Sequence, residues 1–182
     1  MVATIIKTLC LIIILIINNY YLITEYKDNI KIMIVFYVLA FSLCFYFRNS
    51  LTLLLIPTLI NITIKDFKDL RIPHVYNLIL LITNMITAIL YGKSIIQAVI
   101  LMLIMFVIFF IPYIFNKVGG GDLLLIPNLV CFFKYNQIIY FLFLSSIMAI
   151  IIYITLYKRE GKKEVPFGPS MCLSYLIISL LF

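Results

Sequence analysis

The sequence predicts an all-α protein, a polytopic bundle of about eight transmembrane helices. Hydrophobic residues make up 65% of its 182 residues, and the mean hydropathy is +1.21. Charged residues are only 12% of the chain and fall mainly in short gaps between apolar runs. This composition cannot supply the polar surface of a soluble domain. The net charge of +7 does not indicate a nucleic-acid partner, because the basic residues lie in these gaps and form no aromatic-interleaved patch.

The apolar runs divide the chain into two parts. Residues 1–50 hold two N-terminal spans, at 1–24 and 30–47, and a cleaved signal peptide is the alternative for the first of them, although no small-residue cleavage site follows it. Residues 51–182 hold a core of six spans. These are expected at 51–64, 75–91, 94–115, 122–134, 138–157 and 169–182.

Two gaps in this core carry aspartates. The charged gap 65–73 ends in Pro73, which favours a new helix after it. Three glycines precede Asp122 in the other gap, where the missing Cβ atoms permit close approach and positive φ values. Asp122 is expected to cap or begin a helix, because free N–H groups there favour a carboxylate. A flexible turn with an N-cap aspartate is the alternative interpretation.

Both aspartates are expected on one side of the membrane, because two spans separate Asp66 from Asp122. The gaps on that side carry ten lysines and arginines, against four on the other side. The positive-inside rule then places the aspartates at the cytoplasmic side. The run 122–134 reaches only about 20 Å at helical rise, short of a hydrocarbon core of about 30 Å, and 51–64 is similarly short. These helices are therefore expected to begin or end below the membrane surface and to admit water.

Two aspartates in a partly apolar site share a proton, because like charges raise the pKa of one of them. The ionised carboxylate can take a proton from water while the protonated one polarises a scissile carbonyl, as in aspartic proteases. No cofactor or metal is expected, since the chain has one histidine, His74, and no cofactor-binding motif. The four cysteines lie far apart within apolar runs, which argues against a disulfide framework. They are Cys10, Cys44, Cys131 and Cys172.

Three short motifs lie in order along residues 51–182. They are Asp66-Phe67-Lys68 followed by Arg71-Ile72-Pro73, Gly119-Gly120-Gly121-Asp122, and Pro166-Phe167-Gly168-Pro169. Together they resemble the motifs of the type IV prepilin peptidases, intramembrane aspartic proteases of the GxGD type. The resemblance implies that Asp66 and Asp122 are the catalytic pair.

The resemblance also implies a substrate and a location. The substrate is a prepilin-like protein, such as a type IV pilin, pseudopilin or preflagellin, whose short basic leader precedes a hydrophobic helix. Cleavage is expected at the cytoplasmic boundary of the cell membrane, with the lipid bilayer as the other partner. Larger family members carry a cysteine-rich insert and methylate the new N-terminus. This chain has no such insert, so N-methylation is not expected. The sequence does not specify the oligomeric state.

Several alternatives remain open at this stage. Asp69 competes with Asp66 by proximity, although its spacing to Pro73 differs from the motif. His74 and Leu124 stand where the family commonly has asparagine and lysine, which bears on substrate affinity. Presenilin-type enzymes share Gly-x-Gly-Asp, but their Tyr-Asp and Pro-Ala-Leu motifs are missing. The chain could also be a small transporter, a pilus or secretion assembly subunit, or an inactive peptidase; a transporter would place acids mid-helix and show repeated halves.

Overall fold

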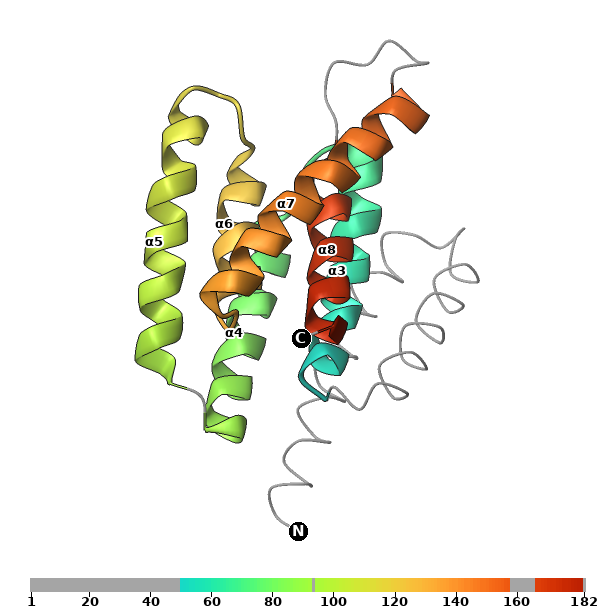
Figure 1. Ribbon diagram of the computed structural model, residues 1–182. Coiled ribbons are helices and arrows are strands. Elements are labelled where there is room, and N and C mark those ends of the chain that lie inside the picture. Colours follow the sequence, from blue (N-terminus) through green and yellow to red (C-terminus); the bar gives the residue numbers. More distant parts are fainter. Residues whose placement is uncertain (1–49, 93, 158–165, 182) are drawn as a thin grey trace.

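The computed structural model describes residues 50–92, 94–157 and 166–181, which form a bundle of six α-helices without a strand (Figure 1). The helices are α3 (Ser50–Asp69), α4 (His74–Tyr91), α5 (Ile95–Ile114), α6 (Gly120–Val130), α7 (Tyr135–Ile152) and α8 (Gly168–Leu181), and α7 continues as a π-helical turn over Tyr153–Tyr157. The all-helical prediction is confirmed for these residues. The two spans expected before residue 50 lie outside them, so the count of eight stays a prediction.

The helix α3 is longer than the sequence pattern predicted. The charged gap was expected to begin at Lys65, but α3 continues to Asp69 and includes Asp66 in its last turns. No glycine or proline lies between Lys65 and Leu70, and an ion pair of 2.9 Å between Lys65 and Asp69 links successive turns. Leu70 then takes a left-handed conformation with φ of 51°, which ends α3. Pro73 follows as the extended N-cap residue of α4.

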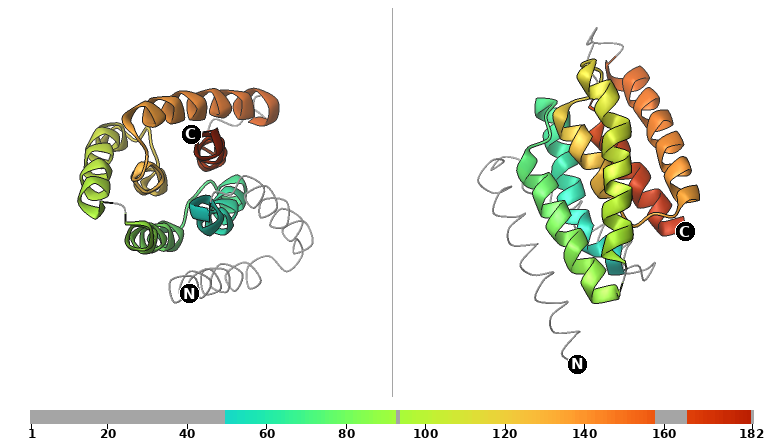
Figure 2. Two further views of the ribbon diagram at one scale, coloured as in Figure 1. Left: turned by 60° about the horizontal axis from the view of Figure 1, so that its bottom comes forward. Right: turned by 90° about the vertical axis from the view of Figure 1, so that its left-hand side faces the viewer.

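The six helices run alternately up and down, and α6 lies inside the bundle (Figures 1 and 2). Helix α5 packs on α6, α7 packs on α8, and α8 and α6 pack in turn on α3 and α4. Nearly all of α6 after Asp122 is buried, whereas α5 buries only Ala98 and Met105. The rest of α5 presents exposed large apolar side chains. An outer helix of this kind suits contact with lipid better than contact with water.

Two helices are long and apolar enough to cross a membrane, at Ile95–Ile114 and Tyr135–Thr155, among the residues that the structure describes. The other apolar helices are shorter. In particular, the 11 residues of α6 span about 16 Å, roughly half of a hydrocarbon core. This length agrees with the expectation that the run after Asp122 is too short to cross the membrane alone. The same expectation for residues 51–64 is wrong, because α3 has 20 residues.

Asparagine side chains join α4 to α6 in the middle of the bundle. Asn77 donates to the carbonyl of Gly121 at 3.0 Å, and Asn128 donates back to the carbonyl of Asn77 at 3.1 Å. One step further along, Asn84 donates to the carbonyl of Asn128 at 2.7 Å. The partners are seven residues apart on each helix, so they lie on one face of each. These buried bonds fix how far α6 slides along α4, and therefore where Asp122 lies.

Candidate active site

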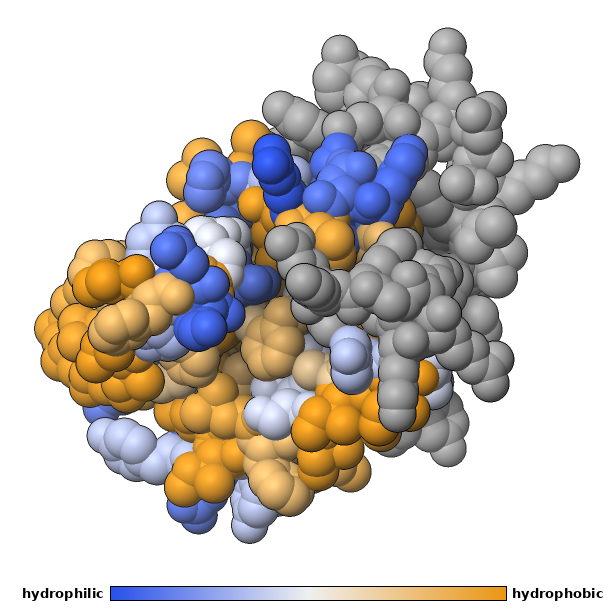
Figure 3. Space-filling model, turned by 90° about the horizontal axis from the view of Figure 1, so that it is seen from above, coloured by the Kyte–Doolittle hydropathy of each residue, from blue (hydrophilic) through white to orange (hydrophobic). Residues whose placement is uncertain are grey.

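The two aspartates come from different helices and meet at one end of the bundle. Asp66 lies near the end of α3 with 4% of its surface exposed, and Asp122 lies half-buried in the first turn of α6. Asp122 was expected to cap or begin this helix, but Gly119 is the N-cap and Gly120 is the first helical residue. Asp122 is instead the third residue of α6. Both aspartates line two adjoining cavities of about 400 and 710 Å³. Figure 3 looks down on this end and shows hydrophilic residues gathered there beside apolar ones.

A backbone amide from the third motif holds the carboxylate of Asp66. The N–H of Gly168 donates to Asp66 Oδ2 at 2.8 Å, across 102 residues of sequence. Burial raises the pKa of Asp66, and this hydrogen bond opposes the rise because it favours the charged form. Pro-Phe-Gly-Pro therefore contributes a hydrogen bond to the site in addition to starting α8.

Asp122 has the more strongly raised pKa. Burial is the main cause that raises the pKa of Asp122 to about 7, and the neighbouring charge of Asp66 adds to the rise. A hydrogen bond with the backbone of Gly119 acts in the opposite direction and lowers the pKa. Its Oδ1 atom is buried and has no hydrogen-bond partner among the described residues. A protonated Oδ1 could donate to a substrate carbonyl placed in the cavity. The pair can therefore hold a single proton near neutral pH, with Asp122 as its main carrier.

The glycines before Asp122 act through their missing Cβ atoms. The expectation of unusual φ values is wrong, because Gly92 is the one described glycine with a positive φ. A Cβ on Gly121 would lie 2.7 Å from Ile72 Cβ and 2.8 Å from the Ile72 carbonyl oxygen. Ile72 also packs beside Gly168, where an added Cβ would lie 3.2 Å from Ile72 Cδ1. The buried Ile72 thus separates two glycines, and all three motifs meet around it.

The remaining residues of the motifs occupy different places. Arg71 and His74 line the cavity of 400 Å³ with all three glycines, and Phe167 lines the cavity of 710 Å³. Pro166 and Pro169 are buried, and Lys68 is exposed on α3. Leu124 lies half-buried in α6.

Asp69, the competing acid, lies outside this arrangement. It is exposed at the end of α3 and forms the ion pair with Lys65. It is absent from the lining of both cavities that contain Asp66 and Asp122. The geometry therefore favours Asp66 over Asp69 as the partner of Asp122.

Sequence reasoning missed several residues that complete the cavity of 710 Å³. Phe109 and Tyr113 come from α5, Lys117 follows α5, and Ile126 comes from α6. Leu70, with its left-handed backbone, lines both cavities. A leucine after a charged helix end and aromatic residues in an apolar span carry no distinctive signal. Only the folded arrangement shows that they surround the aspartates.

A protein-family model for type IV leader peptidases matches residues 53–154, more than half of the chain. The chain belongs to the type IV leader peptidase family. The matched region contains both aspartates and the three glycines, and it ends before the Pro166–Pro169 motif. No curated protein and no solved structure matches the chain. Family membership and the two long apolar helices together indicate a membrane protein.

Replacing Gly168 by alanine tests the contact between the third motif and Asp66. The new Cβ would lie 2.9 Å from Asp66 Oδ2 and 3.3 Å from Asp66 Cβ, so the carboxylate must move. We expect Gly168→Ala to lower the rate of leader cleavage by about tenfold or more, because small displacements at a reacting group cost large factors in rate. The measurement is the initial cleavage rate at equal protein level. A rate equal to that of the intact protein would contradict this role of Gly168.

Proposed function

We propose that this chain is a membrane-embedded aspartic endopeptidase that removes the leader peptide of prepilin-like proteins. The observation that carries the proposal is that the buried Asp66 and the half-buried Asp122 line the same two cavities in a member of a leader peptidase family. The implied substrates are type IV pilins, pseudopilins or preflagellins. The two N-terminal spans, the cytoplasmic position of the site and the location in the cell membrane are parts of the same proposal.

The environments of the two carboxyl groups suggest different roles. The ionised Asp66, held by the Gly168 N–H, takes a proton from a water in the cavity, and the resulting hydroxide attacks the scissile carbonyl carbon. Asp122, which holds the shared proton, donates it to the carbonyl oxygen. The tetrahedral intermediate then collapses as the C–N bond breaks. Asp66 gives its proton to the leaving amine, and Asp122 takes a proton from one hydroxyl group of the intermediate. The new carboxyl and amino ends leave, and the pair again holds one proton.

This mechanism predicts a fall in activity at alkaline pH. The pKa of Asp122 is raised to about 7, so the shared proton is present below that pH and is lost above it. We therefore expect kcat/KM to fall as the pH rises from about 7 to 9, toward a tenfold decrease per pH unit. The measurement is kcat/KM across this range, on a substrate without titratable side chains near the cut. A rate that stays level or rises through pH 9 would contradict the proton-sharing pair.

The experiment that tests the function uses the purified full chain in liposomes. A prepilin-like substrate is added in the same membrane, and mass spectrometry identifies the products. We expect one cut, at the boundary between the leader and the apolar helix, and no added methyl group on the new N-terminus even when a methyl donor is present. Absence of cleavage with pilin, pseudopilin and preflagellin substrates alike, by protein shown to be folded, would contradict the proposal.

A further inference from the structure

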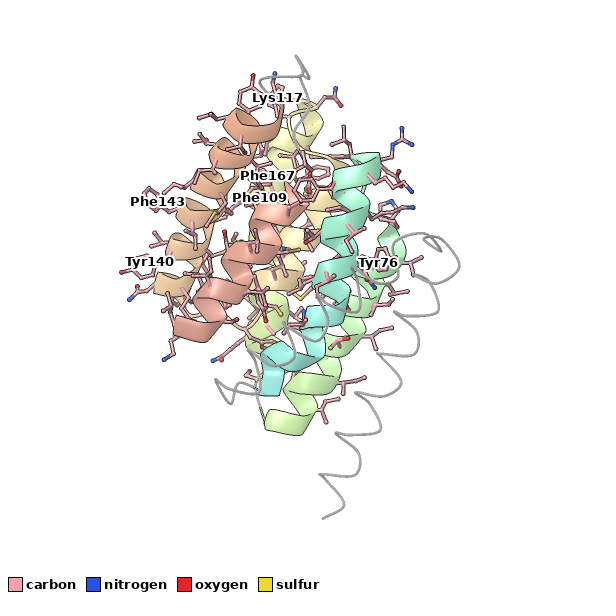
Figure 4. The ribbon with its side chains drawn as sticks, turned by 90° about the vertical axis from the view of Figure 1, so that its right-hand side faces the viewer. Tyr76, Phe109, Lys117, Tyr140, Phe143 and Phe167 are labelled. Atoms are coloured by element: carbon pink, nitrogen blue, oxygen red, sulfur yellow. The ribbon has the colours of Figure 1, made fainter. Side chains whose placement is uncertain are left out.

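An apolar cavity adjoins the candidate active site. Its volume is about 170 Å³, and it shares Phe109, Ile126 and Phe167 with the cavity of 710 Å³ that contains both aspartates. Its remaining lining comes from α7 and α8, at Phe141, Leu142, Ser145, Ser146 and Met171. Phe109 and Phe167 lie near each other in Figure 4, whereas Tyr140 and Phe143 point outward from α7. The two cavities therefore adjoin each other, and Asp66 and Asp122 line only the larger one.

Residues of both α5 and α7 line the cavity of 170 Å³, so this cavity lies between the two helices. Helix α5 packs on α6 and α7 packs on α8, whereas α5 and α7 are not a closely packed pair. Helix α7 leans away from α5 toward the end of the bundle that carries the aspartates, and α6 is visible between them (Figure 1). An apolar segment lying in the membrane could therefore reach the aspartates between these two helices.

The chemistry of the smaller cavity selects an apolar group. Its polar side chains are Ser145 and Ser146, and both hydroxyl groups already donate to the carbonyl of Leu142, at 3.0 and 2.8 Å. The other lining residues are phenylalanine, leucine, isoleucine and methionine, which are all apolar. A cavity of about 150 Å³ lined in this way holds a benzene ring. The volume of about 170 Å³ thus suits one large apolar side chain.

We propose that this cavity is a specificity pocket for the first large apolar side chain after the scissile bond of the substrate. The apolar segment of the substrate enters between α5 and α7, and it passes Phe109 and Phe167, which line both the pocket and the cavity of the aspartates. The inference rests on the proposed function and adds to it the part of the site that recognises the substrate's membrane segment. The position of the pocket directly beside the cavity of the aspartates favours this occupant over a lipid chain.

The test changes the size of the pocket in opposite directions. Ser145→Leu fills the pocket from α7, Phe109→Ala enlarges it from α5, and Phe143→Ala is a matched truncation on the exposed face of α7. Each variant is assayed with four substrates that differ only at the position of the first large apolar residue after the cut, which is alanine, leucine, phenylalanine or tryptophan. The ratio of kcat/KM values between substrates cancels general losses of activity or protein.

We expect Ser145→Leu to lower the ratio of phenylalanine to alanine substrate by about tenfold or more, since small volume changes in apolar pockets give this discrimination. Phe109→Ala should raise the ratio of tryptophan to leucine substrate, and Phe143→Ala should leave all ratios unchanged. Equal changes for all four substrates would overturn the proposal. So would loss of a bound lipid from Ser145→Leu protein, detected by mass spectrometry, without a change in these ratios.

Cross-linking separates failure of the pocket from failure of the proposed function. A photoreactive phenylalanine analogue replaces the first large apolar residue of the substrate, and the enzyme carries Asp122→Asn to prevent cleavage. We expect cross-links to the residues of α5 and α7 that line the pocket, and fewer in Ser145→Leu. Such cross-links without cleavage by the intact chain would support the docking site and contradict the peptidase reaction. Cross-links elsewhere would overturn the pocket itself.

Discussion

Gly121→Ala is expected to lower leader cleavage by about 100-fold or more, a loss typical of misplacing a reacting group by about 1 Å. The added Cβ would overlap Ile72 at both its Cβ, 2.7 Å away, and its carbonyl oxygen, 2.8 Å away. A backbone atom cannot turn aside like the end of a flexible side chain. Helix α6 must therefore shift from the turn between α3 and α4, and Asp122 moves with it. The measurement is the initial rate of cleavage by purified protein in liposomes.

Gly120→Ala is the matched control for this prediction. It lies in the same turn of α6, but its added Cβ would meet only Tyr113 Cε2, at an ordinary contact distance of 3.7 Å. We expect Gly120→Ala to fold at the yield of the intact protein and to lose far less cleavage than Gly121→Ala. If both variants lost the same fraction of the cleavage rate, the close contact between Gly121 and Ile72 would not explain why position 121 needs glycine.

Removal of either carboxyl group is expected to have the largest effect on activity. Asp66→Asn leaves no base to take a proton from water, and Asp122→Asn leaves no carboxylic acid to protonate the carbonyl oxygen. Each substitution keeps the size of the side chain, so folding should change little. We expect kcat/KM to fall by about 1,000-fold or more in each, within the usual range for general acid–base groups. The double variant should be no slower than either single one, because the two groups act as a unit.

The order of the helices could be predicted from the sequence because apolar runs and polar gaps alternate along it. The end of α3 could not, because Lys65 and Asp69 stabilise a helix as readily as they fill a loop. The left-handed turn at Leu70 also lacks the glycine or asparagine that usually marks such an end. Local patterns thus indicate where the helices lie, but they do not show that α3 continues to Asp69 and ends at the left-handed Leu70.

The candidate site was predictable only in part. The motifs singled out Asp66 and Asp122, and counting spans placed them at one side. The hydrogen bond from Gly168 to Asp66 joins residues 102 positions apart, so no local pattern predicts it. The contact between Gly121 and Ile72 also forms only when α6 packs against the turn after α3.

The asparagines that join α4 to α6 were also missed. They do carry a signal in the sequence, because Asn77 and Asn84 are polar residues seven positions apart in a mainly apolar span. Such spacing predicts one polar face in a helix, and buried amides require hydrogen-bond partners. What the spacing cannot show is that their partners lie on α6, next to Asp122.

One measurement tests the central claim most directly: leader cleavage by the intact chain beside Asp66→Asn, Asp122→Asn and Asp69→Asn, at equal amounts of folded protein in one membrane. Asp69 is the matched control, since it lies three residues from Asp66 but is exposed and ion-paired with Lys65. The account predicts cleavage by the intact chain and by Asp69→Asn, and none above background by the other two. Cleavage by either Asp66→Asn or Asp122→Asn at a rate near that of the intact chain would contradict a mechanism built on this pair.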